Sequence, residues 1–187
     1  MKGFFFGSFD PPHIGHLNVV TTALNSGYVD KVEVIPAFKS VWKNTETPWD
    51  YRLMMCQMTF NNIPNVQING IEYLLAKGEP LPTYKVIDFL KEQEKEDFYI
   101  ITTNETYREI RVWQNGERIL QENKFLVVCS HHFPEILELG IFDISTYAPN
   151  ITICSTNLRQ KIKSGELVQP FILPDVLRYI HKLNLYK

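Results

Sequence analysis

The sequence predicts an α/β fold: a Rossmann-like, doubly wound, mostly parallel sheet with helices on both faces. Short apolar runs, typical of strands buried on both faces, alternate along the chain with stretches of helical periodicity. This alternation gives βαβ units, whose strands pair in parallel. The 187 residues suffice for one sizeable core, and no internal repeat or linker divides them. We therefore expect a single domain over residues 1–187.

The amino-terminal segment predicts a β–α–β unit. Residues 2–6 are a short apolar run that ends in glycine, which favours a buried strand. Apolar residues at helical spacing follow over 17–24, and we expect this helix to start near residue 14 or 15. We interpret residues 31–37, KVEVIPA, as the second strand, which Pro36 stops.

The middle of the chain predicts a helix, a strand and a second helix. Thr47 followed by Pro48 is typical of a helix start, with threonine as the cap, and helical spacing continues over 49–60. Residues 65–73 alternate in polarity, which indicates a strand. An amphipathic pattern over 83–96 indicates the next helix.

The remaining elements complete the alternation. The strands expected here cover residues 97–103 and 124–130, with a further strand or loop over 140–148 and a strand that passes into a short helix over 150–166. The helices expected here cover residues 104–113, 116–121 and 173–186. Ligands of such sheets bind beyond the carboxyl ends of the strands. Residues 7–16 and 102–106 should therefore lie near one another at that edge.

Composition and charge exclude several functional classes. The formal net charge is −2 and no long block of lysine or arginine occurs, which argues against duplex nucleic acid as a partner. The first apolar run is too short for a signal peptide, and no stretch approaches a membrane span. We therefore expect a cytoplasmic protein without a membrane partner; a homo-oligomer stays open. The three cysteines are never spaced C-x-x-C, which favours neither a disulfide framework nor a zinc site.

The loop GSFDPPHIGH, residues 7–16, places two histidines three apart at an expected helix start. Backbone N–H groups at a helix start lack intrahelical partners, and the helix dipole favours anions there. Gly15 removes a side chain between His13 and His16, and residues three apart share a helix face. Both imidazoles can therefore point at one bound phosphate and stabilise its charge in phosphoryl or nucleotidyl transfer.

The residues of this loop also permit other interpretations. Either histidine could be structural or merely exposed. The pair could instead bind zinc, although Asp10 is the one obvious third ligand nearby, and we expect no resident metal. The loop matches neither the G-x-G-x-x-G dinucleotide pattern nor the P-loop pattern.

The segment GSFDPPHIGHL resembles the signature of the HxGH nucleotidyltransferase superfamily, in the form of its nicotinate-nucleotide adenylyltransferase branch. A second segment, ICSTNLR at 153–159, resembles the late motif I-S-S-T-x-x-R of that family. Ser155 and Thr156 fall at an expected helix start, where hydroxyls and N–H groups can hold phosphate oxygens. Arg159 can reach the same anion with its planar guanidinium. Taken alone, this segment could also be a helix cap followed by a solvated arginine.

The resemblance implies an enzyme that joins the adenylyl group of ATP to nicotinate mononucleotide, in NAD biosynthesis, and releases pyrophosphate. Nicotinamide mononucleotide is the alternative acceptor, and Mg²⁺ would accompany ATP as the cofactor. The catalytic residues that it implies are His13, His16 and Arg159. The ATP-binding residues that it implies are Gly7, Ser8, Phe9, His13, Gly15, His16, Ser155, Thr156 and Arg159.

Weaker correspondences imply an acceptor site. LPTYKVIDFL resembles the start of a family helix near the acceptor, which would place Thr83 and Tyr84 there. YREIRVWQNGERIL resembles the segment whose tryptophan stacks on the pyridine ring, which would be Trp113. Trp113 is also spaced three residues from Ile110, as a core residue would be.

Two departures from the family pattern affect the acceptor site. The usual P-P-H-K-like run after the second strand is absent, so either Lys39 or Lys43 is the candidate phosphate ligand. The usual I-I-G-x-D run is replaced by IITTN, in which Asn104 offers hydrogen bonds without charge. Two other functions therefore stay open: a related nucleotidyltransferase with a different phosphorylated acceptor, and a non-catalytic nucleotide-binding relative.

Overall fold

The computed structural model describes residues 1–39, 47–129, 141–144 and 153–187, and within them six strands form one sheet. The strands are β1 (Lys2–Gly7), β2 (Lys31–Pro36), β3 (Val66–Ile68), β4 (Phe98–Thr103), β5 (Lys124–Val128) and β6 (Ile141–Asp143). Their order is β3-β2-β1-β4-β5-β6, and every adjacent pair is parallel. The expected α/β architecture with a doubly wound parallel sheet is confirmed.

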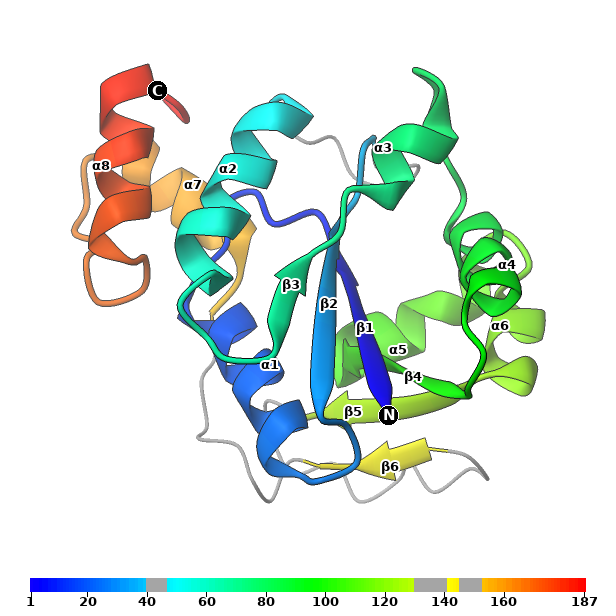
Figure 1. Ribbon diagram of the computed structural model, residues 1–187. Helices are drawn as coiled ribbons and strands as arrows, with labels where there is room; N and C mark the ends of the chain where they lie inside the picture. Colours follow the sequence, from blue (N-terminus) through cyan, green and yellow to red (C-terminus); the bar gives the residue numbers. More distant parts are fainter. Residues whose placement is uncertain (40–46, 130–140, 145–152) are drawn as a thin grey trace.

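Helices cover both faces of the sheet (Figure 1). They are α1 (Ile14–Asn25), α2 (Trp49–Phe60), α3 (Ile71–Ala76), α4 (Thr83–Gln93), α5 (Asn104–Glu109), α6 (Gly116–Glu122), α7 (Ser155–Lys163) and α8 (Pro174–Leu183), with a 3-10 turn, η1 (Ile110–Val112). Helices α1 and α2 pack on one face, and α4, α5 and α6 pack on the other. Helices α7 and α8 form a third core with α2. None of the helices in the described ranges is long and apolar enough to span a bilayer.

The alternation of side chains along β1 builds the two main cores. Phe4 and Phe5 are neighbours in sequence but point to opposite faces, because successive side chains of a strand alternate. Phe5 packs in one core with Val20 of α1 and Phe60 of α2, and Phe4 packs in the other with Ile87 of α4. Because both faces of the strand are buried, its sequence is a continuous apolar run, and this made the strand recognisable.

Residues 65–73, expected to form one strand, contain a turn, and the expectation is wrong beyond Ile68. Strand β3 ends there, and α3 begins at Ile71. The Asn69 side chain accepts a hydrogen bond from the Ile71 N–H (2.9 Å) and donates one to Glu33 Oε2 (2.7 Å). A hydrogen bond from an asparagine side chain to the backbone two residues ahead is an Asx turn, which redirects the chain. The alternation of polarity does not reveal such a turn.

Several helix boundaries differ from the expected ones. Pro48 occupies the cap position of α2, which has no side-chain cap. The Thr47 carbonyl instead accepts a hydrogen bond from Arg52 Nε (3.0 Å). The expected helix over 104–113 divides into α5 and η1, and the expected strand or loop over 140–148 contains the strand β6.

Candidate active site

The candidate active site lies where the strand order of the sheet reverses. Strand β1 pairs with β2 on one side and with β4 on the other, so the connections that leave β1 and β4 diverge. Open α/β sheets bind ligands at such a point. A cavity of about 630 Å³, which we call the larger cavity, opens here. The loop after β1, the first turn of α1, α5 and residues 153–159 all contribute to its lining, so the two expected motifs are adjacent.

His13 and His16 form a reciprocal cap at the start of α1. His13 Nδ1 accepts a hydrogen bond from the Gly15 N–H (3.1 Å), and His16 Nδ1 accepts one from the His13 N–H (3.2 Å). A neutral imidazole has one acceptor nitrogen and one N–H donor, so each ring carries its proton on Nε2. The ring centroids lie 3.8 Å apart, and both residues line the larger cavity. The helix start therefore carries two adjacent Nε2–H donors.

Burial keeps the His13 ring neutral. The residue is 5% exposed, and burial lowers its pKa to about 4, because the charged imidazolium is poorly solvated there. Gly15 makes this ring position possible, since a Cβ atom there would lie 2.9 Å from His13 Nδ1 and 3.2 Å from Ile153 Cγ2. The glycine between the two histidines is therefore required by the position of the His13 ring.

Phe9 supports the histidine pair from the core. Its φ of +50° is a left-handed conformation that bulky residues seldom adopt, and the residue is 1% exposed. The Phe9 ring meets the His16 ring at a centroid distance of 4.9 Å. A Cβ atom on Gly7 would lie 2.9 Å from Phe9 Cζ, so Gly7 leaves room for this ring. Ser8, between them, also lines the larger cavity.

The late motif joins α7 to the loop after β1. Ser155 Oγ donates a hydrogen bond to the Pro11 carbonyl (2.9 Å), and Arg159 Nη1 donates one to the Asp10 carbonyl (2.7 Å). Arg159 Nη2 also lies 3.5 Å from Thr156 Oγ1. Ser155, Thr156 and Arg159 all line the larger cavity. The motif therefore connects two segments far apart in sequence and contributes its own polar groups to the cavity.

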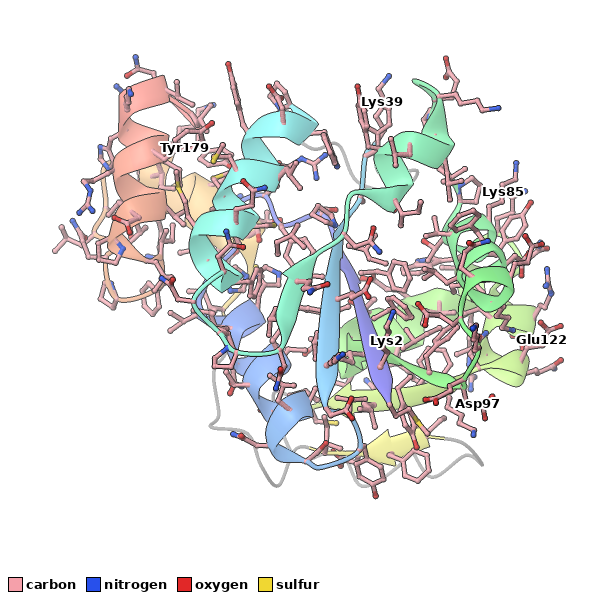
Figure 2. The ribbon with its side chains drawn as sticks, viewed as in Figure 1. Lys2, Lys39, Lys85, Asp97, Glu122 and Tyr179 are labelled. Carbon is pink, nitrogen blue, oxygen red and sulfur yellow. The ribbon has the colours of Figure 1, made fainter. Side chains whose placement is uncertain are left out.

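A second cavity of about 120 Å³, which we call the smaller cavity, adjoins the first. Both cavities are lined by Phe6, Gly7, Ser8, Thr106 and Glu109. Three of the expected acceptor residues, Lys39, Thr83 and Trp113, line the smaller cavity. Trp113 also packs against the core beneath the cavity. It is therefore both a lining residue of the cavity and a partly buried core residue. Figure 2 shows Lys39 beside α3, where its Nζ donates a hydrogen bond to the Gly78 carbonyl (2.7 Å).

Two of the other expected acceptor residues, Tyr84 and Asn104, line neither cavity. Tyr84 packs against the apolar core and lines neither cavity. Helix α4 begins at Thr83, and consecutive helix residues point about 100° apart, which turns Tyr84 away. Asn104 is 2% exposed, lines neither cavity, and its Oδ1 has no hydrogen-bond partner among the described residues. Lys43 lies outside the described residues.

Arg52 and Glu72 are buried charged residues beside the site that the sequence motifs did not single out. Arg52 is fully buried, and Glu72 is 4% exposed and lines the smaller cavity. Burial raises the pKa of Glu72 to about 7, against the opposing effect of a hydrogen bond from the Phe38 N–H (2.8 Å). A single arginine within the apolar helical run RLMMC is the signal that could have identified Arg52.

Known proteins are similar to this chain in sequence over nearly their full length. The cytidylyltransferase-like family model matches residues 4–161. A Thermus thermophilus protein named "probable nicotinate-nucleotide adenylyltransferase" is 28% identical over 189 residues, which cover 99% of this chain and 98% of that protein. A Hydrogenobaculum protein of the same name is 32% identical and covers 98% of this chain and 96% of its own length.

Solved structures share the fold. The Plasmodium falciparum nicotinic acid mononucleotide adenylyltransferase complexed with NaAD has a TM-score of 0.80 at 22% identity, with 99% of this chain and 96% of that one covered. The same enzyme complexed with APC has a TM-score of 0.77. The sequence matches establish the family, and the structural similarity establishes the fold. The chain therefore belongs to the cytidylyltransferase-like family and, within it, to the nicotinate-nucleotide adenylyltransferases.

Proposed function

We propose that this chain transfers the adenylyl group of ATP to nicotinate mononucleotide, forming the dinucleotide and pyrophosphate in NAD biosynthesis. The observation that carries the proposal is the pair of Nε2–H donors on His13 and His16, in a cavity continuous with one lined by Trp113. The larger cavity suits a nucleoside triphosphate, and the smaller one suits a flat ring beside an indole. Relatives named for this activity support the proposal.

The acceptor supplies the nucleophile in this reaction. An oxygen of its phosphate, ionised at neutral pH, attacks the α-phosphorus of ATP; the bond from that phosphorus to the bridging oxygen breaks, and pyrophosphate leaves. The reaction needs no general base and forms no covalent enzyme intermediate. Alignment of the two substrates and stabilisation of charge therefore supply the catalysis. Because its ring stays neutral with the proton on Nε2, His13 donates a hydrogen bond to the phosphates beside His16.

The remaining side chains would hold the two ends of the substrates. We assign Ser155, Thr156 and Arg159 to the leaving pyrophosphate, since all three line the larger cavity. Lys39 lines the smaller cavity and would add a cation near the acceptor phosphate, with Thr83 and Trp113 around the acceptor. Tyr84 and Asn104 would support this wall from within the core.

Mg²⁺ enters the proposal as part of the MgATP substrate. When bound, it would neutralise part of the negative charge that develops on the leaving pyrophosphate. In the part of the chain that the structure describes, no three His, Cys, Asp or Glu side chains are grouped to hold a metal ion. Asp10, in the loop of the two histidines, accepts a hydrogen bond from the Tyr186 hydroxyl (2.6 Å). We therefore propose phosphate and water as the main ligands of the ion.

Pyrophosphate release from a panel of substrates tests the proposed function. The panel contains ATP with nicotinate mononucleotide, nicotinamide mononucleotide or pantetheine phosphate, and CTP with an alcohol phosphate. We expect the highest kcat/KM with nicotinate mononucleotide and MgATP. Preference for a non-pyridine acceptor would refute the proposed acceptor. Tight ATP binding in calorimetry without pyrophosphate release from any pair would indicate a non-catalytic protein instead.

Four features of the biological context stay predictions. They are a single domain over residues 1–187, a cytoplasmic location, the absence of nucleic-acid and membrane partners, and a possible homo-oligomer. Although the family model ends at residue 161, α8 packs against α2, and this contact supports one domain that includes the carboxyl end.

A further inference from the structure

We propose that Arg52 and Glu72 are positioning residues that hold the loops after β1 and β2 at the separation required for adenylyl transfer. This inference rests on the proposed function, because it concerns the alignment of the two substrates. Neither side chain is assigned a contact with a reacting atom.

Arg52 connects three backbone segments. It lies in the first turn of α2 and is fully buried. Its Nη1 donates a hydrogen bond to the Ser8 carbonyl (2.7 Å), its Nη2 to the Phe38 carbonyl (2.7 Å) and its Nε to the Thr47 carbonyl (3.0 Å). A planar guanidinium with donors in fixed directions thereby sets the distance between the loops that contain Ser8 and Phe38.

Glu72 holds the same residue of the second loop from another side. Its Oε1 accepts a hydrogen bond from the Phe38 N–H (2.8 Å), while Arg52 holds the Phe38 carbonyl. Glu72 lies in the first turn of α3, so the N–H and carbonyl of Phe38 are fixed by two different helices. Although burial raises the pKa of Glu72 to about 7, both its protonated and its ionised form retain an oxygen that can accept this hydrogen bond.

The two loops held in this way both contribute to the lining of the site. Ser8 lines both cavities and precedes Phe9, which packs against His16. Phe38 precedes Lys39, which lines the smaller cavity. Reacting atoms must approach to about 3–3.5 Å, and a displacement of about 1 Å can reduce the rate by about 10²-fold. Loosening the backbone at Phe38 should therefore lower kcat more than it raises either KM.

Glu72→Ala and Glu72→Gln separate positioning from general stability. Alanine removes the acceptor of the Phe38 N–H, whereas glutamine leaves an oxygen in its place. We expect kcat for pyrophosphate release to fall about tenfold or more in Glu72→Ala and to stay within about threefold of wild type in Glu72→Gln. Ala76→Gly is the matched control, because it weakens the buried end of the same helix without removing this hydrogen bond. The control should keep the wild-type kcat.

Wild-type kcat in folded Glu72→Ala would overturn the proposal. Equal losses in the alanine and glutamine variants would also overturn it, because hydrogen-bond acceptance could then not be the cause. If Glu72→Ala does not fold, Glu72→Asp replaces it, since the side chain is one methylene shorter and should show the same loss.

Hydrogen exchange at the Phe38 amide gives a readout that does not depend on activity. We expect faster exchange in Glu72→Ala and wild-type exchange in Glu72→Gln and Ala76→Gly. Unchanged exchange in Glu72→Ala would contradict the positioning role. If the wild-type protein releases no pyrophosphate with any acceptor, the proposed function fails, and the exchange rates still show whether Glu72 holds the loop.

Arg52→Lys tests the other half of the pair. Lysine keeps the positive charge, but its single ammonium cannot hold three carbonyls with the geometry of a guanidinium. We expect kcat to fall about tenfold or more in this variant. The double variant Arg52→Lys/Glu72→Ala should lose less than the product of the single losses, because both changes release the backbone of the same residue, Phe38. Losses that multiply in full would contradict a shared role.

Discussion

The two cavities of the candidate site are assembled in different ways. Most of the lining of the larger cavity comes from two short continuous segments, residues 7–16 and 153–159. The smaller cavity takes one to three residues from each of several separate segments, among them those that contain Lys39, Thr83 and Trp113. A helix cap such as the histidine pair is a local structure, so its sequence pattern is visible. A cavity wall built by tertiary packing has no such sequence pattern. Sequence motifs therefore identify the residues of the larger cavity more completely than those of the smaller one.

The strongest test of this comparison removes one donor from the larger cavity. We expect His16→Ala to lower kcat by about 10²–10³, because one group that stabilises developing charge is lost, while KM for the acceptor stays near wild type. Steady-state pyrophosphate release at saturating ATP measures the effect. His181→Ala on α8 is the control and should keep the wild-type kcat. Turnover near wild type in folded His16→Ala would refute the assigned role.

Acid should destabilise the protein through the buried His13. Its pKa is about 4 in the folded state and about 6.5 when exposed, so the unfolded state binds the proton first as pH falls. The contribution of His13 to the free energy of unfolding is therefore complete above pH 6.5 and is lost progressively as the pH falls toward 4. Between pH 7 and 4.5 we expect this histidine to account for about 2 kcal/mol.

Urea denaturation at the two pH values measures this loss. His13→Asn is the comparison variant, because asparagine can cap the helix but does not titrate. It should lose about 2 kcal/mol less than wild type over that interval. Equal losses in the two proteins would show that His13 does not titrate as its burial requires.

A substitution in the smaller cavity should affect the acceptor alone. Trp113→Ala removes the ring proposed to stack on the pyridine, and stacking of a base on an aromatic side chain contributes about 1–3 kcal/mol. We expect KM for nicotinate mononucleotide to rise about tenfold, with KM for ATP unchanged. Trp113→Phe retains a flat ring and should stay within about threefold of wild type. Loss of thermal stability with unchanged KM would identify Trp113 as a core residue only.

The smallest expected effect concerns Lys39. Its ammonium lies at the rim of the smaller cavity and already donates to the Gly78 carbonyl. An exposed charge contributes up to about 1 kcal/mol, so Lys39→Met should raise KM for the acceptor about threefold, and less at high salt. Lys85 on α4, also labelled in Figure 2, lines neither cavity. The control variant Lys85→Met should therefore leave KM for the acceptor unchanged. Identical kinetics in the two variants would exclude Lys39 as a phosphate ligand.

The parts of the fold that the sequence predicted are those specified by short-range patterns. Apolar runs identified β1, β4 and β5 because these parallel strands are buried on both faces. The start of α1 was predicted near residue 14 or 15, ahead of the helical spacing over 17–24, and the helix begins at Ile14. The turn at Asn69 was missed because its side-chain hydrogen bonds depend on Ile71 and Glu33, not on polarity alone.

The parts of the site that the sequence did not reveal depend on contacts between distant residues. Tyr84 follows Thr83 in the chain, yet the rotation of α4 places only Thr83 in the smaller cavity. Arg52 and Glu72 lie 20 positions apart, and their common partner Phe38 lies in a third segment. No spacing rule connects such residues, because the sheet and helices must form before the three segments meet.

The protonation state of the two histidine rings decides whether both can donate hydrogen bonds to a bound nucleotide. Nitrogen-15 NMR of the imidazoles, recorded at pH 7 before and after addition of a non-hydrolysable ATP analogue with Mg²⁺, reports which nitrogen of each ring carries the proton. We expect Nε2–H for both His13 and His16 in the free protein, and a change at both Nε2 nitrogens when the nucleotide binds. Protonated Nδ1 in either ring, or nucleotide binding that leaves both Nε2 signals unchanged, would contradict this expectation.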